Sequence, residues 1–162
     1  MAARRRPGSK PQSRSAGRPA RVASPARAKR GPLRFDMRST RTAVPPAVEK
    51  ILAHVDAIGL SENQRADLAI ALSEALANAA IHGNKLRAEC PVAVSVRLGT
   101  VEAAIDIRDC GHGFDHAHVS DPTAESQVLM PGGRGVFLMR HLVDSLEYNR
   151  AGNRVKLVVR RH

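Results

Sequence analysis

Two polar side chains, Glu74 and Asn78, interrupt the alanine- and leucine-rich stretch LSEALANAAIHGN at residues 72–84. Alanine and leucine favour a helix, in which residues four positions apart share one face. Apolar residues lie nearly all the way round this helix, which predicts that it is largely buried. A buried carboxylate is costly unless it has a partner or a chemical task. We therefore predict that this face looks into a site for a metal and a phosphate-bearing ligand.

A second candidate segment is DCGHGFD at residues 109–115. Gly111 and Gly113 permit a close approach of the backbone and positive φ angles. Asp109, at the end of a predicted strand, could accept a hydrogen bond from a ligand amine. The alternative is an ordinary turn, since Asp and Gly are common turn residues.

The third candidate segment is PGGRG at residues 131–135, a glycine-rich turn that runs into a predicted helix. The free backbone N–H groups of Gly133 and Gly135 and the helix dipole would favour a phosphate, and Arg134 adds positive charge. A flexible loop before a helix explains the same residues equally well. The sequence has no GxxxxGK[ST] motif, so a P-loop is excluded.

The elements that would position these segments can be followed along the chain. The alternation in residues 33–38 predicts a short strand with one buried face. Residues 47–58 have apolar side chains at helical spacing after a proline pair, and Gly59 is a plausible stop. Ser61 and Gln64 form a capping-box pattern, which predicts a second helix that ends near His82–Gly83.

The second half of the chain is predicted to contain more strands than helices. Residues 92–98 and 101–109 suit an antiparallel hairpin, and 116–131 lack periodicity, which predicts a loop or lid. A helix over 136–146 and two strands, 145–149 and 153–161, follow. This order predicts an α+β two-layer sandwich, in which helices cover one face of a mostly antiparallel mixed sheet. A Rossmann site is disfavoured because no alternating strand–helix pattern builds a parallel sheet.

Composition limits the possible functions. The chain has 162 residues, enough for one domain with a sizeable core, and aromatic residues make up only 2%, which argues against a surface that stacks bases. No apolar run approaches membrane-spanning length. The two cysteines form neither a CxxC pair nor a disulfide framework, and we expect a reducing, cytoplasmic setting.

Positive charge is concentrated in residues 1–31, which hold ten Lys or Arg and no acid. Residues 32–162 therefore have a formal charge of only +1, and we predict that they form the folded domain. Residues 1–31 are rich in Arg, Ala, Pro and Ser, a composition that predicts disorder. Three interpretations of this tail stay open: a dispensable solvated tail, an arm that contacts nucleic acid or an acidic partner, or a transit peptide.

The three segments together, in this order, resemble the N, G1 and G2 boxes of the GHKL (Bergerat-fold) ATPases, the superfamily that includes the histidine kinases. Within it, SEALANAAIHGN, DCGHGFD and GGRGVFLMRHLVDSLEY are most similar to the short anti-sigma-factor serine/threonine kinases of the RsbW type. The resemblance covers about residues 33–160 and leaves only the tail outside.

This resemblance implies a role for each matching residue. Asn78 would coordinate the Mg²⁺ that bridges the phosphates of ATP, and Glu74 would be the general base. Asp109 would recognise the adenine amino group, with Gly111 and Gly113 shaping the pocket. The phosphates would contact Gly133, Arg134 and Gly135. The alternative for Glu74 is a salt-bridged helix residue, and for Asp109 a plain turn residue.

The partners implied by the resemblance are a sigma factor, which is held inactive, and an antagonist protein, which is phosphorylated on Ser or Thr. A homodimer is expected as well. The alternative function is an ATP-gated anti-sigma or regulatory binding module without significant kinase activity. A weaker third hypothesis is nucleic-acid binding through the basic tail.

Overall fold

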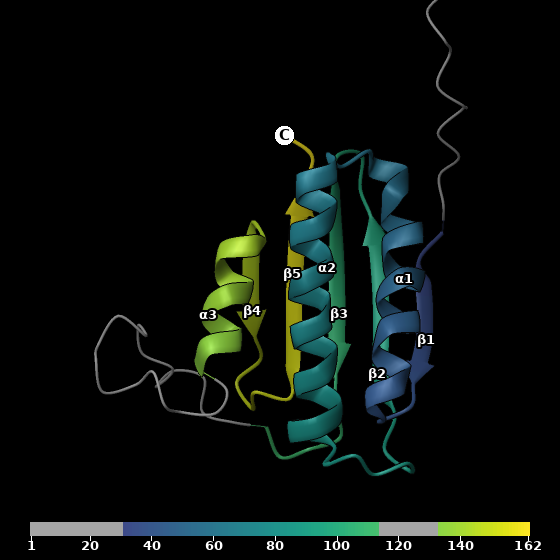
Figure 1. Cartoon of the computed structure of the whole chain (residues 1–162), viewed down its shortest axis with the longest axis vertical. Helices are drawn as coiled ribbons and strands as arrows, with labels where there is room; N and C mark the ends of the chain where they lie inside the picture. Colours follow the sequence, from purple (N-terminus) through teal and green to yellow (C-terminus); the bar gives the residue numbers. More distant parts are fainter. Residues whose placement is uncertain (1–30, 114–132) are drawn as a thin grey trace, which may run out of the picture.

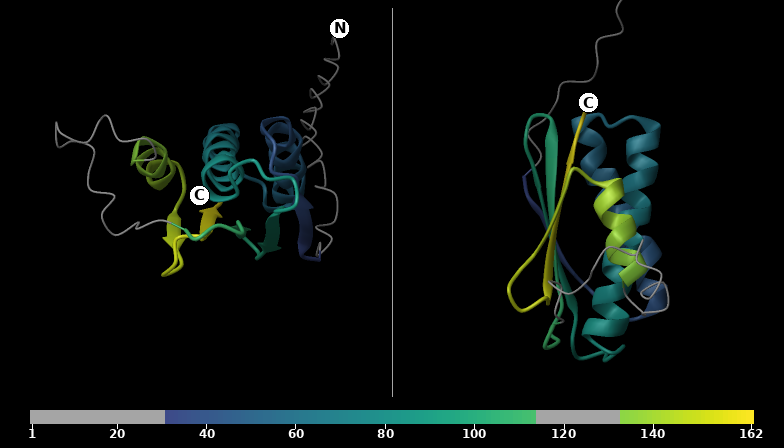
Figure 2. Two further views of the ribbon diagram at one scale, coloured as in Figure 1. Left: turned by 90° about the horizontal axis from the view of Figure 1, so that it is seen from below. Right: turned by 90° about the vertical axis from the view of Figure 1, so that its left-hand side faces the viewer.

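The computed structural model describes residues 31–113 and 133–162. The predicted lid at 116–131 lies outside the described residues. So does the predicted tail at 1–31, apart from Gly31. The described chain forms a five-stranded sheet with three helices on one face (Figures 1 and 2). The strands are β1 (Leu33–Met37), β2 (Val92–Leu98), β3 (Glu102–Arg108), β4 (Ser145–Tyr148) and β5 (Arg154–Arg160), and the α-helices are α1 (Val44–Val55), α2 (Glu62–Ala77) and α3 (Gly133–Leu142).

The sheet has the strand order β1-β2-β3-β5-β4, and all four pairings are antiparallel. The predicted α+β sandwich is confirmed, and the described part of the sheet contains no parallel pair. The two predicted hairpins are present: β2 pairs with β3 through Val96↔Ile105, and β4 pairs with β5 through Leu146↔Leu157.

The first two helices begin and end as the sequence indicates. Proline stands in the first turn of α1, and Gly59 has a φ of 72°, a left-handed conformation that stops the chain from continuing as a helix. Ser61 and Gln64 exchange two hydrogen bonds of 3.2 Å, which confirms the capping box at the start of α2. Such caps stabilise a helix end by about 1 kcal/mol.

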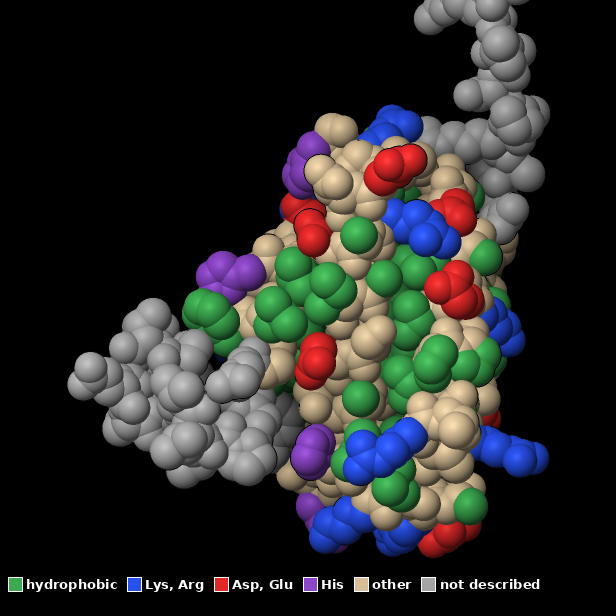
Figure 3. Space-filling view, viewed as in Figure 1, with side chains coloured by type: hydrophobic (Ala, Val, Ile, Leu, Met, Phe, Trp, Pro, Cys, Tyr) green, Lys and Arg blue, Asp and Glu red, His purple; other side chains and the backbone are tan. Residues whose placement is uncertain are grey.

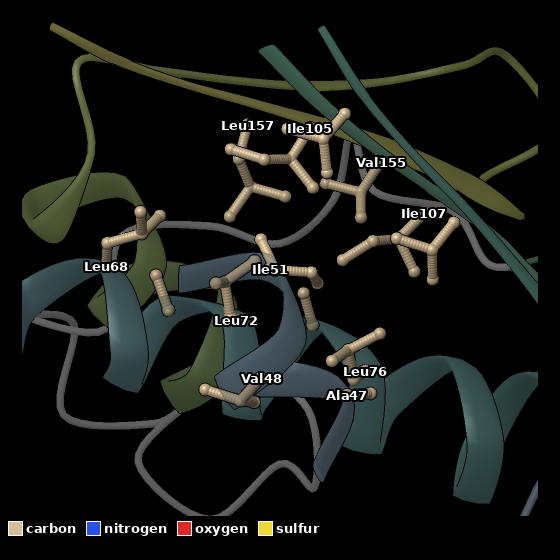
Figure 4. Packing of buried hydrophobic residues seen from close by; sticks show 14 of the residues in the cluster. Ala47, Val48, Ile51, Leu68, Leu72, Leu76, Ile105, Ile107, Val155 and Leu157 are labelled. Atoms are coloured by element: carbon tan, nitrogen blue, oxygen red, sulfur yellow. The ribbon is translucent and has the colours of Figure 1, made fainter. Parts of the chain in front are cut away.

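The core lies between the sheet and the helices. Alternate residues of the central strands point towards the helices, so period-two patterning builds one continuous apolar face. On the sheet side this face includes Ile105, Ile107, Val155 and Leu157, and the helices add Ile51, Leu68, Leu72 and Leu76 (Figure 4).

The predicted burial of residues 72–84 is largely confirmed, since only Ser73 and His82 among them are exposed. Helices α1 and α3 flank α2, and the sheet lies beneath it, so three sides are covered. The fourth side faces away from the sheet, and there Ile70 is 46% exposed. Figure 3, which looks onto the helix layer, shows apolar side chains exposed among polar ones.

Helix α3 is displaced from its predicted position. It begins at Gly133 instead of residue 136, so the glycine-rich segment forms its first turn and does not precede it. It ends at Leu142 instead of residue 146, because Ser145 and Leu146 belong to β4 and pair with Val158 and Leu157. Among the described residues, no helix is long and apolar enough to cross a membrane.

Candidate functional site

Helix α2 continues without a break into a π-helical segment, Asn78–Gly83. Its backbone hydrogen bonds reach one residue further than in an α-helix, as when Asn84 N–H donates to the Ala79 carbonyl at 2.8 Å. Short π segments within helices occur frequently at functional sites. The wider turn begins at Asn78, one of the predicted site residues. Nothing in an alanine-rich sequence distinguishes a π turn from an α turn, so sequence analysis missed this change.

Glu74 and Asn78 both face the first turn of α3. A Cβ added to Gly135 would lie 2.7 Å from Glu74 Oε2 and 3.6 Å from Asn78 Nδ2. A larger residue at position 135 would therefore require the end of the Glu74 side chain to shift, whereas its contact with Asn78 would be an ordinary one. Glu74 is half-buried, and it has no ion-pair partner among the side chains that the structure describes, which do not include Arg134. Those side chains therefore give no support to the salt-bridged alternative for Glu74.

The start of α3 offers backbone donors next to Glu74 and Asn78. Gly133 is the first residue of this ten-residue helix, and Arg134 and Gly135 follow in the same turn. First-turn N–H groups have no partner within a helix, and the helix dipole makes this end partly positive. The Arg134 side chain lies outside the described part of the structure, as do residues 131 and 132.

Asp109 lies against Gly83 and Gly111 at the other end of the π segment. A Cβ on Gly83 would lie 2.6 and 2.7 Å from the two carboxylate oxygens of Asp109, and one on Gly111 would lie 2.8 Å from Oδ1 and overlap the Gly83 carbonyl oxygen. The carboxylate of Asp109 occupies the space that a larger residue at position 83 would need. Gly83 was predicted only as a helix end, and this second role is new.

Burial raises the pKa of Asp109 above its ordinary value of 3.8. Opposing this, the Gly111 N–H donates a hydrogen bond of 2.7 Å to Asp109 Oδ1, which favours the carboxylate. The nearby Arg108 has the same lowering effect. Desolvation is the largest of these influences, as expected for a partly buried acid.

Gly113 completes the turn that follows β3. Its φ is 81°, a conformation that L side chains rarely adopt, and a Cβ there would overlap the Ala151 carbonyl oxygen. The turn therefore packs directly on the connection between β4 and β5. Asn153 in this connection accepts a 3.0 Å hydrogen bond from Asp109 N–H through its carbonyl, and its Nδ2 donates to the Gly111 carbonyl at 3.1 Å.

Two asparagines that sequence analysis did not single out, Asn84 and Asn153, hold the Asp109 segment from opposite sides. Asn84 is fully buried and its Oδ1 accepts a 2.7 Å hydrogen bond from Cys110 N–H. The sequence predicts only a helix end near His82–Gly83. It does not indicate the role of Asn84, whose hydrogen-bond partner Cys110 is 26 positions away.

The structure thus brings five predicted site residues and Gly83 into two groups that are joined by one continuous helix. Glu74, Asn78 and Gly135 form the first group, and Gly83, Asp109 and Gly111 form the second. Gly83 is nine positions after Glu74, about 13 Å along an α-helix axis. The end of β3, the β4–β5 turn, the start of α3 and the end of the π segment lie at the same end of the molecule (Figure 1). A ligand that touches both groups must be elongated, with a hydrogen-bond donor at one end and negative charge at the other.

The described residues contain no group of three or more His, Cys, Asp or Glu that could hold a metal ion. Mg²⁺ commonly keeps few protein ligands and is bound through substrate phosphates. A single amide oxygen from Asn78 beside the first turn of α3 fits that mode of binding.

Comparison with known proteins identifies a match over most of the chain. Residues 37–159 match the family described as the histidine kinase-like ATPase domain. Among solved structures, the RsbU and RsbW domains of Rv1364c from Mycobacterium tuberculosis superpose with a TM-score of 0.56 at 16% sequence identity, over 82% of this chain. This chain covers about a third (32%) of the length of that chain. No curated protein matches this chain in sequence.

Proposed function

This chain belongs to the histidine kinase-like ATPase domain family, and from that premise we propose that it is an ATP- and Mg²⁺-dependent serine/threonine protein kinase that acts as an anti-sigma factor. It would bind a sigma factor and phosphorylate an antagonist protein on Ser or Thr. The observation that carries the kinase activity is the placement of Glu74, a half-buried carboxylate without an ion-pair partner in the described chain, beside the first turn of α3.

The proposed nucleotide lies along the helix from Asp109 to Glu74. Asp109 accepts a hydrogen bond from the adenine amino group, while Gly111 and Gly113 shape the turn beside it and Gly83 leaves space for the Asp109 carboxylate. The first turn of α3, with Gly133, Arg134 and Gly135, binds the phosphates through backbone N–H groups and the Arg134 charge. Asn78 would hold Mg²⁺, and the bound metal ion would neutralise part of the phosphate charge.

Glu74 accepts the proton of the substrate hydroxyl as that oxygen bonds to the γ-phosphorus. The bond from the γ-phosphorus to the β–γ bridging oxygen breaks, so that ADP leaves and a phosphoserine or phosphothreonine remains. A general base of this kind contributes about 10²- to 10⁴-fold to the rate. Asn78 lies one turn from Glu74, so the metal ligand and the base can act on the same phosphoryl group.

The identity of the partners rests on the motif resemblance and on the similarity in fold to a structure that includes an RsbW domain. Because that similarity is at 16% identity, it supports the fold and leaves the sigma factor, the antagonist and a homodimer as proposals. The cytoplasm is the compartment in which such partners would be found.

Glu74→Gln tests the assigned base, since it removes the proton acceptor and keeps the side-chain size. With ATP labelled at the γ-phosphate and proteins captured from native cells, we expect wild-type protein to label a partner and the variant to lose about 100-fold or more in rate. ATP affinity should stay within a few fold. Glu62→Gln, the same change at an exposed position about three turns earlier in α2, should keep full activity.

The alternative is an ATP-gated binding module without significant kinase activity. ATP-dependent capture of a partner, with no transfer of label by wild-type protein, would establish that alternative. Transfer that survives Glu74→Gln would reject the role of Glu74, and an absence of ATP binding would reject both functions.

A further inference from the structure

We propose that Asn84 is a positioning residue for base selection: its buried side-chain amide fixes the backbone at Cys110 and thereby orients the Asp109 carboxylate. This inference rests on the proposed function, because it assigns to Asn84 the discrimination between adenine and guanine nucleotides. Asn84 touches no part of the proposed nucleotide. It would act only through the residue that does.

The amide of Asn84 has one possible orientation. Cys110 N–H is a donor and lies 2.7 Å from one side-chain atom, which must therefore be the oxygen. The Cys90 carbonyl is an acceptor and lies 2.8 Å from the other atom, which must be the nitrogen. The same Nδ2 donates to Ser39 Oγ at 2.9 Å. Asn84 therefore links three segments: the residues after β1, the residues before β2 and the end of β3.

The hydrogen bonds of Asn84 leave it little freedom to move. Its side chain is 0% exposed, so a lost partner could not be replaced by bulk water. Its backbone N–H donates to the Ala79 carbonyl, and its carbonyl accepts from Arg87 N and Nε at 3.1 and 3.2 Å. The position of its Oδ1, and hence of Cys110 N–H, is therefore set by the end of the π segment.

Gly83 and Asn84 act on Asp109 from adjacent positions. Gly83 leaves the space that the Asp109 carboxylate occupies, and Asn84 holds the next peptide unit. If Cys110 N–H were released, the peptide between Asp109 and Cys110 could rotate and turn the carboxylate away from the base. The carboxylate direction matters because adenine presents an amino donor where guanine presents a carbonyl oxygen.

The test measures binding of ATP and GTP by nucleotide-free protein, together with the melting temperature. We expect Asn84→Ala to lower the preference for ATP over GTP by about 10- to 100-fold, the value of one hydrogen bond to a charged group. Ser39→Ala is the matched control, because it removes a partner of the same amide on the side away from Asp109. It should lower the melting temperature and keep the preference.

Hydrogen exchange at Cys110 N–H gives a readout that needs no nucleotide. This proton should be protected in wild type and Ser39→Ala and exchange rapidly in Asn84→Ala. If Asn84→Ala does not fold, Asn84→Ser replaces it: the serine side chain is too short to reach Cys110 N–H, so the variant should show the same rapid exchange and the same lowered preference for ATP.

Two results for Asn84→Ala, or for Asn84→Ser in its place, would contradict the inference: an unchanged preference, or equal losses of affinity for both nucleotides. The proposed function would fail separately, through wild-type protein that binds ATP no better than GTP or binds neither. Loss of ATP preference in Ser39→Ala as well would assign Asn84 a general structural role, and would also overturn the proposal.

Discussion

At the residue scale, the partial burial of the Asp109 carboxylate lowers the stability of the folded chain. Burial raises its pKa, so the carboxylate is less favourable in the folded chain than in the unfolded chain. For an acid with a raised folded pKa, the stabilising contribution is fully present below the unfolded pKa, here 3.8. It is lost as the pH rises through the folded pKa. At pH 7 the ionised side chain therefore weakens the nucleotide-free fold.

Replacement of Asp109 by Asn tests this cost. The amide oxygen of Asn can still accept from Gly111 N–H, and no charge has to be buried. We expect Asp109→Asn to have a higher free energy of unfolding than wild type at pH 7, and the difference to shrink as the pH falls towards 3.8. Urea denaturation at a series of pH values measures it. The same variant should bind ATP about 10- to 100-fold more weakly.

A variant that is less stable than wild type at pH 7 would contradict the prediction, since it would mean that the hydrogen bond from Gly111 outweighs desolvation. Asp56→Asn is a suitable control. Asp56 is an exposed carboxylate paired with Arg65 at 3.0 Å, so its loss should change stability by no more than about 1 kcal/mol.

Some of these residues could be identified from the sequence and others could not. Glu74 and Asn78 stand out because polar residues in an alanine-rich helix are conspicuous, and Asp109 because it follows a strand and precedes glycines. Asn84 and Asn153 could not be found in this way. Their role depends on hydrogen bonds to residues 26 and 42 positions away, and an asparagine near a glycine is typical of any turn.

At the scale of the element, the end of the long helix is unusual. The segment has a glycine at position 83, where a helix C-terminus often uses one in the left-handed conformation. Gly83 does not adopt that conformation, because its role is to leave space for Asp109. The left-handed positions fall instead on Lys85 and Leu86, which have φ angles of 53° and 57°. For residues with a Cβ, each such conformation costs about 1–2 kcal/mol.

Lys85→Gly should therefore stabilise the protein. Removing the Cβ relieves the strain, and part of the gain is offset by the greater entropy of glycine in the unfolded chain. We expect a net increase of about 0.5–1 kcal/mol in the free energy of unfolding relative to Lys85→Ala. Lys85→Ala is the matched control because it removes the same exposed side chain and keeps the strain. Equal stability of the two variants in urea denaturation would rule out strain at this position.

The change from α to π geometry at Asn78 explains why the helix end could be predicted only approximately. The sequence places the end near Gly83, and the helical backbone does stop there. Each hydrogen bond of the π segment encloses one residue more than in an α-helix. The side chains that follow are therefore rotated relative to their positions on an α-helix. Residues 82–84 thus lie on a different side of the helix axis than their spacing from Glu74 implies.

At the scale of the molecule, the order of elements was predictable because each has a local signal. Alternating apolar residues indicate the strands, and a capping box and a left-handed glycine bound the helices. Two hairpins account for two of the four antiparallel pairings, and α3 connects β3 to β4 across the intervening β5. What needed three dimensions was the meeting of α3 with α2, which brings Gly135 to Glu74 across 61 positions of sequence.

The distribution of charge over the whole chain leads to the last prediction. Ten of the 26 Lys and Arg residues lie in residues 1–30, and the family match begins only at residue 37. On the described sheet, Asp106 is buried between Arg154 and Arg97 at 2.7 and 3.4 Å, so part of the positive charge there is already paired. Any strong affinity for DNA should therefore come from the tail.

Deletion of residues 2–30 should leave the melting temperature and the ATP affinity unchanged. If full-length protein binds DNA, the logarithm of its affinity should fall with the logarithm of salt concentration, with a slope as steep as about −9 if all ten cations contact phosphates. The deletion should remove that affinity.

A second variant, in which the ten Lys and Arg residues of the tail are changed to Gln, keeps the tail length. It should behave in the same way, because counterion release depends on charge. Affinity for DNA that survives both changes would place the binding surface on residues 31–162, whose formal charge is only +1, and would contradict the prediction.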